Sequence, residues 1–276
     1  MAIDFELLKK EFQEAVAQAA QEEYWVPEFG ENLVRILPPR DGKLPYRKVG
    51  VHYKLAGSGM VYCPSVAFGE RCPICEVVDD LRKLKSAGAV QLAQRLMVVE
   101  RFLMNLIPLD RGDLRVRQYL APKTVRLHLV KAMLDPDYGD ITDLKTGRNV
   151  VIEKAQGGGG FVNYFVRVKP KQVSVDEILG RKFDIDEIPD FDEFLVRKMK
   201  TYDELKTVLY GGDEVGMEEL VERYVSGDFG GEFVEERNSN AGSLEYSAER
   251  AVKQKDEIDL QEILELAKKI VQKTEK

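Results

Sequence analysis

Four residues of the types that bind transition metals lie close together in the first third of the chain: His52, Cys63, Cys72 and Cys75. Their spacing is H-x10-C-x8-C-x2-C, and the Cys-Pro-Ile-Cys pair forms a tight turn that lets two thiolates reach one ion. Zinc prefers sulfur and imidazole nitrogen in a tetrahedron, and this set fills all four positions. We therefore predict one structural zinc per chain, since a catalytic zinc needs a free position for water.

Other uses of these residues are less favoured. A set of three reduced, buried cysteines beside a surface histidine remains the alternative, and a disulfide-exchange pair lacks the surrounding βαβ pattern. Zinc deaminases carry a Glu two residues after the His and a Pro directly before the first Cys of the pair. Lys54 and Arg71 occupy those positions here, so the general acid/base of a deaminase is missing.

The charge of the chain is unevenly distributed. Residues 24–182 hold 26 Lys and Arg against 17 Asp and Glu, net +9, whereas residues 1–23 are net −4 and residues 183–276 are net −12. A polyanion responds to the local field and not to the total of −7. The basic middle is therefore the part in which we expect nucleic acid to bind.

Positive and aromatic side chains interleave on the strands predicted in this basic middle. Alternation along a strand places Arg115, Arg117 and Tyr119 on one face. Rings beside a positive groove suit unpaired bases, because duplex stacking hides the base faces. The alternative is that the rings are core and the arginines are a solvated surface. The candidate DNA-binding residues are Tyr46, Arg47, Lys48, Arg101, Phe102, Arg115, Arg117, Tyr119, Phe161, Tyr164 and Arg167.

Hydrophobic periodicity predicts the elements that carry these residues, and the fold class is α+β, mainly antiparallel β. The four glycines of residues 157–160 indicate a hairpin loop beside Phe161. Strands are expected at 33–37, 48–55, 97–109, 114–120, 149–153 and 161–168. Helices are expected at 3–23, 76–86, 122–133, 190–199, 201–209, 215–225 and 258–275.

Composition sets the broad class. Apolar residues make up 44% and charged residues 32%, which is ordinary for a globular chain. No apolar run approaches a membrane span and the N-terminus lacks a secretory pattern, so we expect a cytoplasmic protein without membrane contact. Three cysteines within thirteen residues do not form a secreted disulfide framework.

From Asn32 to about Leu179 the chain resembles the single-stranded DNA-binding (helix-destabilising) proteins of T-even bacteriophages. The zinc spacing is the most specific part of the resemblance. The other matching segments are Arg35-Ile36-Leu37-Pro38; Pro45, Tyr46 and Arg47; Asn105 within Phe102 to Ile107; Asp140-Ile141-Thr142 with Gly147 and Asn149; and Gly160-Phe161-Val162-Asn163-Tyr164.

The resemblance implies an OB-fold barrel with an inserted zinc-binding subdomain, whose groove holds single-stranded DNA by stacking and phosphate contacts. It also implies that Phe161, Tyr164 and an aromatic near Phe102 lie in the cleft. The expected organisation is an N-terminal helix at 1–23, the OB-fold core at 24–182 with zinc bound at about 50–90, an acidic helical region at 183–225, a linker at 226–247 and a C-terminal helix at 248–276.

Two features depart from that family. Its short N-terminal segment is basic and serves cooperative contacts, whereas residues 1–23 are net −4 here. Its acidic tail recruits replication proteins, whereas the acidity here lies mainly in residues 183–237.

The functional hypothesis is a non-enzymatic viral protein that binds single-stranded DNA in replication, recombination and repair, with protein partners at the acidic region. The alternative is a zinc-stabilised protein-interaction or RNA-binding module. A metal-dependent nuclease lacks a carboxylate set at usable spacing.

Overall fold

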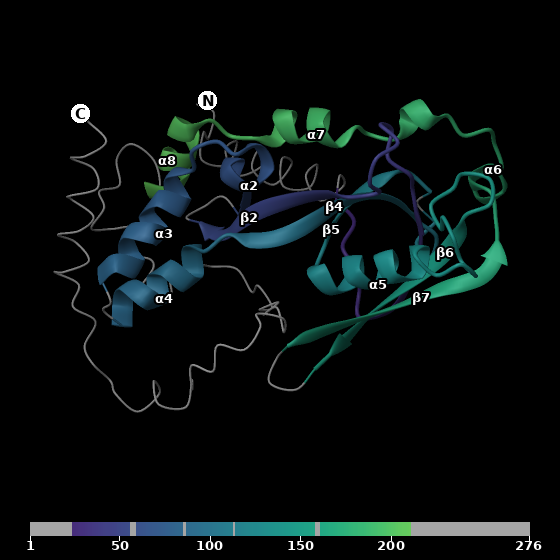
Figure 1. Cartoon of the computed structure of the whole chain (residues 1–276), viewed down its shortest axis with the longest axis horizontal. Helices are drawn as coiled ribbons and strands as arrows, with labels where there is room; N and C mark the ends of the chain where they lie inside the picture. Colours follow the sequence, from purple (N-terminus) through teal and green to yellow (C-terminus); the bar gives the residue numbers. More distant parts are fainter. Residues whose placement is uncertain (1–23, 56–58, 85–86, 113, 158–160, 211–276) are drawn as a thin grey trace, which may run out of the picture. The chain divides into compact units, whose positions relative to one another are not determined.

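The computed structural model describes residues 24–55, 59–84, 87–112, 114–157 and 161–210 (Figure 1). The chain divides into two compact units. In the described residues, unit 1 comprises 24–48 and 101–194, and unit 2 comprises 49–100 and 195–210 with the gaps just given. Antiparallel strands and helices make up both units, which confirms the predicted α+β class. In the described part of the chain, no helix is long and apolar enough to cross a membrane.

Unit 1 is built on antiparallel strands in the order β4-β1-β6-β7, with β5 paired to β4. Val34 of β1 faces Pro108 on one side and Val150 on the other, which fixes the register of the sheet centre. Lys154 and Tyr164 are partners in the β6–β7 hairpin. The strands are β1 (Gly30–Ile36), β4 (Val99–Pro108), β5 (Arg117–Ala121), β6 (Arg148–Gln156) and β7 (Val162–Gln172).

Helix α5 (Lys123–Met133) packs against β7 and covers one face of this sheet (Figure 1). Its Val125 and Leu129 join the main apolar core of the unit, together with Val34 and Ile152 of the sheet. Burial of these branched side chains is the main force that holds helix and sheet together.

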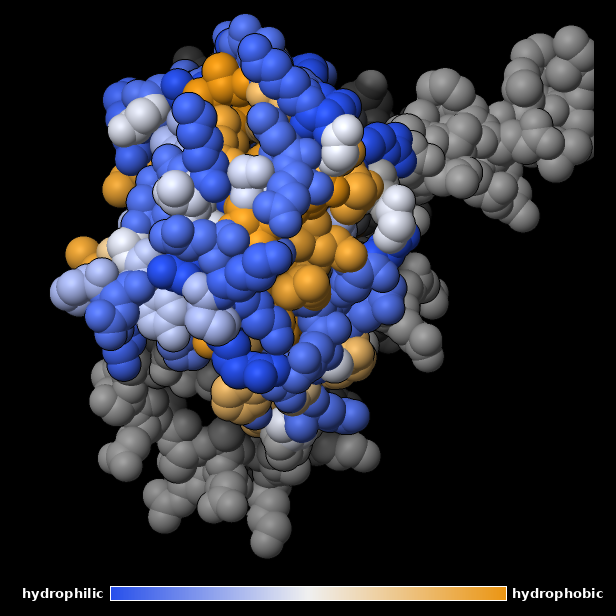
Figure 2. Space-filling view, turned by 90° about the vertical axis from the view of Figure 1, so that its right-hand side faces the viewer, coloured by the Kyte–Doolittle hydropathy of each residue, from blue (hydrophilic) through white to orange (hydrophobic). Residues whose placement is uncertain are grey.

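A smaller core lies where the chain leaves β7. It contains Leu37, Ile107, Val175, Phe183 and Ile188. Three short helical elements follow β7: α6 (Val175–Leu179), a 3-10 helix η2 (Ile185–Glu187) and α7 (Phe191–Lys198). Figure 2 views the end of unit 1 that bears α6, where hydrophilic residues border a strip of hydrophobic residues.

Unit 2 combines an antiparallel strand pair with helices. His52 and Val61 are partners in the ladder of β2 and β3. Ile74, Leu81 and Leu205 are buried in its apolar core, and α3 packs against both α4 and α8. The elements are β2 (Arg47–Leu55), β3 (Gly59–Tyr62), α2 (Pro64–Phe68), α3 (Pro73–Leu84), α4 (Ala87–Leu96) and α8 (Tyr202–Tyr210).

Most predicted elements of the described residues are confirmed with shifted ends, including the hairpin around the glycine run. The predicted strand at 114–120 is wrong at its start, because β5 begins at Arg117 and Arg115 precedes it. Elements β3, α2, α4, α6 and η2 were not predicted from the pattern. The helices expected at 3–23, 215–225 and 258–275 and the linker at 226–247 lie outside the described residues.

Candidate metal centre and nucleic-acid interface

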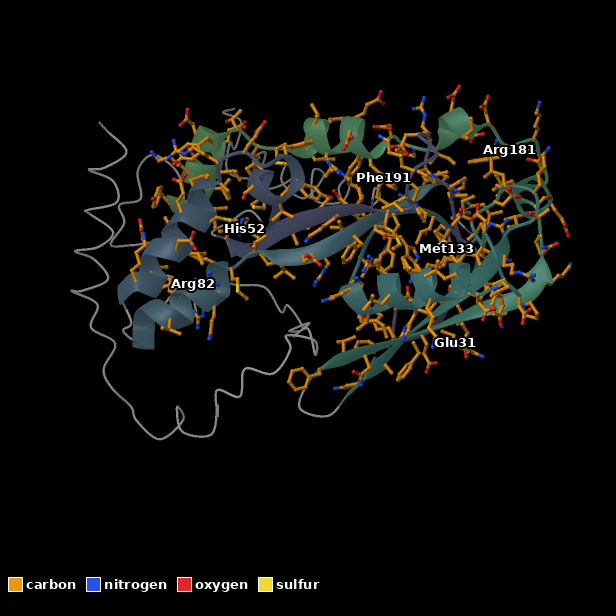
Figure 3. The ribbon with its side chains drawn as sticks, in the orientation of Figure 1. Glu31, His52, Arg82, Met133, Arg181 and Phe191 are labelled. Atoms are coloured by element: carbon orange, nitrogen blue, oxygen red, sulfur yellow. The ribbon has the colours of Figure 1, made fainter. Side chains whose placement is uncertain are left out.

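Three short elements of unit 2 bring the four predicted metal ligands together. His52 lies on β2, Cys63 is the N-cap residue of α2, and Cys72 and Cys75 flank the start of α3 (Figure 3 labels His52). The amide of Cys63 donates to the carbonyl oxygen of Gly50, and the amide of Glu76 donates to that of Cys72. Backbone hydrogen bonds therefore fix the two turns that carry the thiols.

The distances fit a tetrahedral zinc site. All four ligand atoms lie within 4.8 Å of one another. His52 Nε2 is 3.5 Å from Cys72 Sγ and 3.7 Å from Cys75 Sγ, and Cys63 Sγ is 3.5 Å from Cys75 Sγ. Zinc bonds of about 2.3 Å to sulfur and about 2.0 Å to nitrogen give tetrahedral edges of roughly 3.5 to 3.8 Å. The three separations given match these edges, and the other pairs of ligand atoms lie no more than 4.8 Å apart, so the cluster is close to the size of a zinc coordination shell.

The second nitrogen of His52 orients the ring. Nδ1 lies 2.9 Å from the carbonyl oxygen of Leu96, to which it can only donate. Nε2 is then the nitrogen directed at the thiols, and once deprotonated it offers the lone pair that a metal ion binds. The His52 ring and the Cys63 and Cys72 thiols are buried, while Cys75 is half-buried. The cluster is therefore closed to solvent on most sides, which suits a structural ion.

In the absence of an ion, His52 would hold a proton and Cys63 would readily give one up. Burial lowers the pKa of His52, but hydrogen bonds with Cys63 and Cys72 outweigh it and raise the pKa to about 9. Hydrogen bonds from Cys72 and Cys75 lower the pKa of the Cys63 thiol. A bound zinc would displace the His52 proton and any proton left on the thiols, since it needs thiolates and neutral imidazole.

A polar network from α8 supports the turn at Cys72. Arg71 donates to both carboxylate oxygens of Glu76 at 2.9 and 3.3 Å, and the Tyr202 hydroxyl donates to Oε2 of Glu76 at 2.7 Å. The Arg71 guanidinium carbon also lies 5.1 Å above the Tyr202 ring. Burial and the hydrogen bond to Glu76 raise the pKa of Tyr202 to about 12, so the phenol stays a donor. The network ties α8 to the two residues that flank the Cys72–Cys75 turn.

All eleven predicted DNA-binding residues lie in unit 1, but the structure divides them by burial. Four are buried: Arg101 is 5% exposed, Phe102 and Tyr119 are 3% exposed, and Tyr164 is 9% exposed. Tyr119 makes an edge contact with Trp25 at 4.9 Å between ring centroids. The rings of Phe102, Tyr119 and Tyr164 belong to the main core, so they offer little surface on which a base could stack.

The remaining seven residues reach the surface. Lys48, Arg115, Phe161 and Arg167 are exposed, with 37% of Phe161 accessible, while Tyr46, Arg47 and Arg117 are half-buried. Arg47 pairs with Asp192 at 3.2 Å and Arg167 pairs with Glu31. Of the two hairpin aromatics three residues apart, Phe161 is therefore the accessible ring and Tyr164 is a core ring.

Two of the predicted rings form an aromatic pair at the edge of the main core. Tyr46 and Phe102 meet edge to face, with centroids 5.6 Å apart. The sequence interpretation missed Arg126 of α5, whose guanidinium carbon lies within 5.1 Å of both rings. It also missed Phe165, which is 52% exposed, and Phe29, whose ring lies 4.9 Å from the Lys154 ammonium. The signal that could have indicated Arg126 is a predicted helix without acidic residues directly after a basic strand.

Comparison with known families gives one result. The family model described as gp32 DNA binding protein like matches residues 28–208, which include the metal cluster and all eleven predicted DNA-binding residues. No curated protein sequence matches the chain at a significant level.

Proposed function

The chain belongs to the gp32 DNA-binding-protein-like family, and on this premise we propose that it binds single-stranded DNA without sequence preference and catalyses no reaction. The observation that carries the proposal is the family match across both units together with the positive charge of residues 24–182, net +9. Replication, recombination and repair of viral DNA in the host cytoplasm are the processes in which such a protein would act.

The proposed binding surface uses the accessible members of the predicted set. Lys48, Arg115 and Arg117 supply positive charge for phosphates, and Phe161 at the hairpin loop supplies a ring for a base. The buried residues Arg101, Phe102, Tyr119 and Tyr164 are left out of this contact surface. We assign the antiparallel strands of unit 1 to the OB-fold barrel that the family resemblance implies.

We assign a structural zinc ion to His52, Cys63, Cys72 and Cys75, one per chain. The donor types, the fit of the measured separations to a tetrahedron and the presence of a fourth protein ligand where a catalytic zinc would bind water support this role over hydrolysis. When bound, the ion would neutralise the thiolates and stabilise β2, α2 and the start of α3 around a small core. The acidic residues from 183 onward are the part proposed to contact replication proteins.

Binding of a fluorescein-labelled oligo(dT), followed by anisotropy and competed with unlabelled strands, tests the function. We expect mixed-sequence single-stranded DNA to compete about as well as oligo(dT), and duplex of equal length to compete poorly. Equal competition by duplex, or no binding of oligo(dT) at low salt, would refute the proposal. Preferential competition by oligo(rU) would instead support the alternative of an RNA-binding module.

A further inference from the structure

An arginine outside the predicted set is enclosed by two of the rings in unit 1. Phe102 of β4 pairs with Ala121 of β5, and the chain passes through Pro122 directly into α5. This path places Arg126, in the first turns of the helix, with its guanidinium carbon 4.9 Å from the Phe102 ring and 5.1 Å from the Tyr46 ring. One of its terminal nitrogens donates to the Tyr46 hydroxyl at 3.2 Å.

Arg126 has a full positive charge without an acidic partner among the residues that the structure describes. Its side-chain contacts there are the two rings and the Tyr46 hydroxyl. Its Nε is buried without a hydrogen-bond acceptor. By contrast, Arg47 and Arg167 of the same unit each pair with a carboxylate.

The helix that carries Arg126 is itself basic. The sequence of α5, KTVRLHLVKAM, contains Lys123, Arg126 and Lys131 and no Asp or Glu. A half-buried cation without a counter-ion is costly unless an anion from outside approaches it. Arg126 therefore combines a guanidinium held between two rings, an unsatisfied donor and a position on a helix without acidic residues.

A guanidinium can use its faces and its edge at the same time. Its flat, weakly hydrated faces stack on aromatic rings, while the N–H groups at its edge match the oxygens of a phosphate. Within the described ranges, the Arg126 side chain forms one donor bond, to the Tyr46 hydroxyl. The ring contacts restrict the side chain before any ligand arrives, so less conformational entropy is lost on binding.

We propose that Arg126 binds a backbone phosphate of single-stranded DNA and holds the half-buried ring of Tyr46 in position for an adjoining base. This inference rests on the proposed function and names a contact within it. Tyr46 is then the ring that meets the base, and Phe102 is the buried support against which Arg126 and Tyr46 pack.

The test compares the full-length protein with its Arg126→Gln and Arg126→Lys variants, using oligo(dT) anisotropy over a range of salt concentrations. Loss of one phosphate contact should reduce the slope of log K against log salt by about 0.7 in magnitude and weaken binding roughly tenfold at low salt. Arg126→Lys should keep most of the slope, because the charge remains, but should bind more weakly than wild type because the planar contacts with both rings are lost.

Lys131→Gln is the matched control, because it removes one positive charge from the exposed side of the same helix. Its slope should change by much less than that of Arg126→Gln. An unchanged slope for Arg126→Gln, or an equal change for Lys131→Gln, would overturn the proposal while leaving single-strand binding by the wild type intact. If Arg126→Gln does not fold, Arg126→Lys becomes the test, and binding of oligo(dT) by this variant with wild-type affinity would contradict the inference.

If the wild-type protein does not bind oligo(dT), the proposed function itself fails. That outcome is distinct from a wild-type protein that binds normally while its Arg126 variants keep the same salt slope.

Discussion

The close approach at Gly50 should control the stability of the metal cluster. A Cβ added there would lie 2.6 Å from Cγ2 of Val98 and 2.7 and 2.8 Å from Cγ2 and Cβ of Val66. All three separations are shorter than carbon atoms tolerate, and Cβ of Val66 cannot move without its backbone. The carbonyl of Gly50 accepts from the amide of Cys63, so a shift of β2 would move a metal ligand.

Gly50→Ala should therefore destabilise unit 2 by overpacking, at about 1 to 3 kcal/mol. For a domain of roughly 60 to 100 residues, this lowers the unfolding midpoint by at least about 4 °C. Thermal unfolding followed by circular dichroism measures the midpoint, and transfer of zinc to a chromophoric chelator measures how firmly the ion is held. We expect a lower midpoint and faster transfer.

A double variant gives the control. Val98→Ala removes the shortest of the three contacts. It should therefore lower the free energy of unfolding less in the Gly50→Ala background than in the wild type, with a coupling energy between the two substitutions of at least about 0.5 kcal/mol. A wild-type midpoint and wild-type zinc transfer for Gly50→Ala would refute the argument that packing at Gly50 positions Cys63.

Three further results are expected. Cys72→Ser should remove zinc from the purified protein, as elemental analysis would show, and a full complement of zinc in this variant would contradict the assigned site. Phe161→Ala should weaken oligo(dT) binding by about 1 to 3 kcal/mol with little change in thermal stability, whereas Tyr164→Ala should lower stability because its ring is only 9% exposed. Equal thermal stability of the two variants would contradict the assignment of Phe161 to the surface and Tyr164 to the core. Hydrogen bonds from Arg181 and the Asp184 amide lower the pKa of Glu187 to about 2. The stabilisation that these bonds give is fully present above the pKa of the unfolded chain, near 4.5, and is lost as the pH falls toward 2. Arg181→Ala should therefore raise the pKa of the Glu187 carboxyl group, as measured by NMR.

The metal ligands could be predicted from the sequence because their chemistry depends on residue type. Sulfur and imidazole at short, clustered spacing have few other uses in a reduced chain, and the structure places all four within 4.8 Å. The hairpin of β6 and β7 could also be predicted from the sequence, since the glycine run at 157–160 separates two segments of alternating apolar and polar residues.

The exposure of the aromatic residues could not be predicted. Alternation along a strand places Tyr164 and Phe165 on opposite faces, but it does not show which face α5 covers. The helix covers the face of Tyr164, which leaves that ring 9% and Phe165 52% exposed. The contacts of Arg126 with Tyr46 and Phe102 also depend on tertiary structure, because both rings are far from it in the chain.

Short elements were missed for a different reason. Helix α2 spans five residues, too few for a helical period to show, and its end depends on Gly69 at φ 74°, a left-handed conformation that glycine adopts without strain. Helix α4 carries Gly88 and follows α3 within two residues, so its pattern merges with that of its neighbour.

The salt dependence of binding to single-stranded and duplex DNA of equal length tests the central claim most directly. If about five basic side chains contact phosphates, log K for the single strand should fall against log salt with a slope of roughly −3.5, and the duplex should bind more weakly at every salt concentration. Equal affinities for the two forms at matched salt, or single-strand binding that does not depend on salt, would contradict a basic, aromatic surface that recognises unpaired DNA.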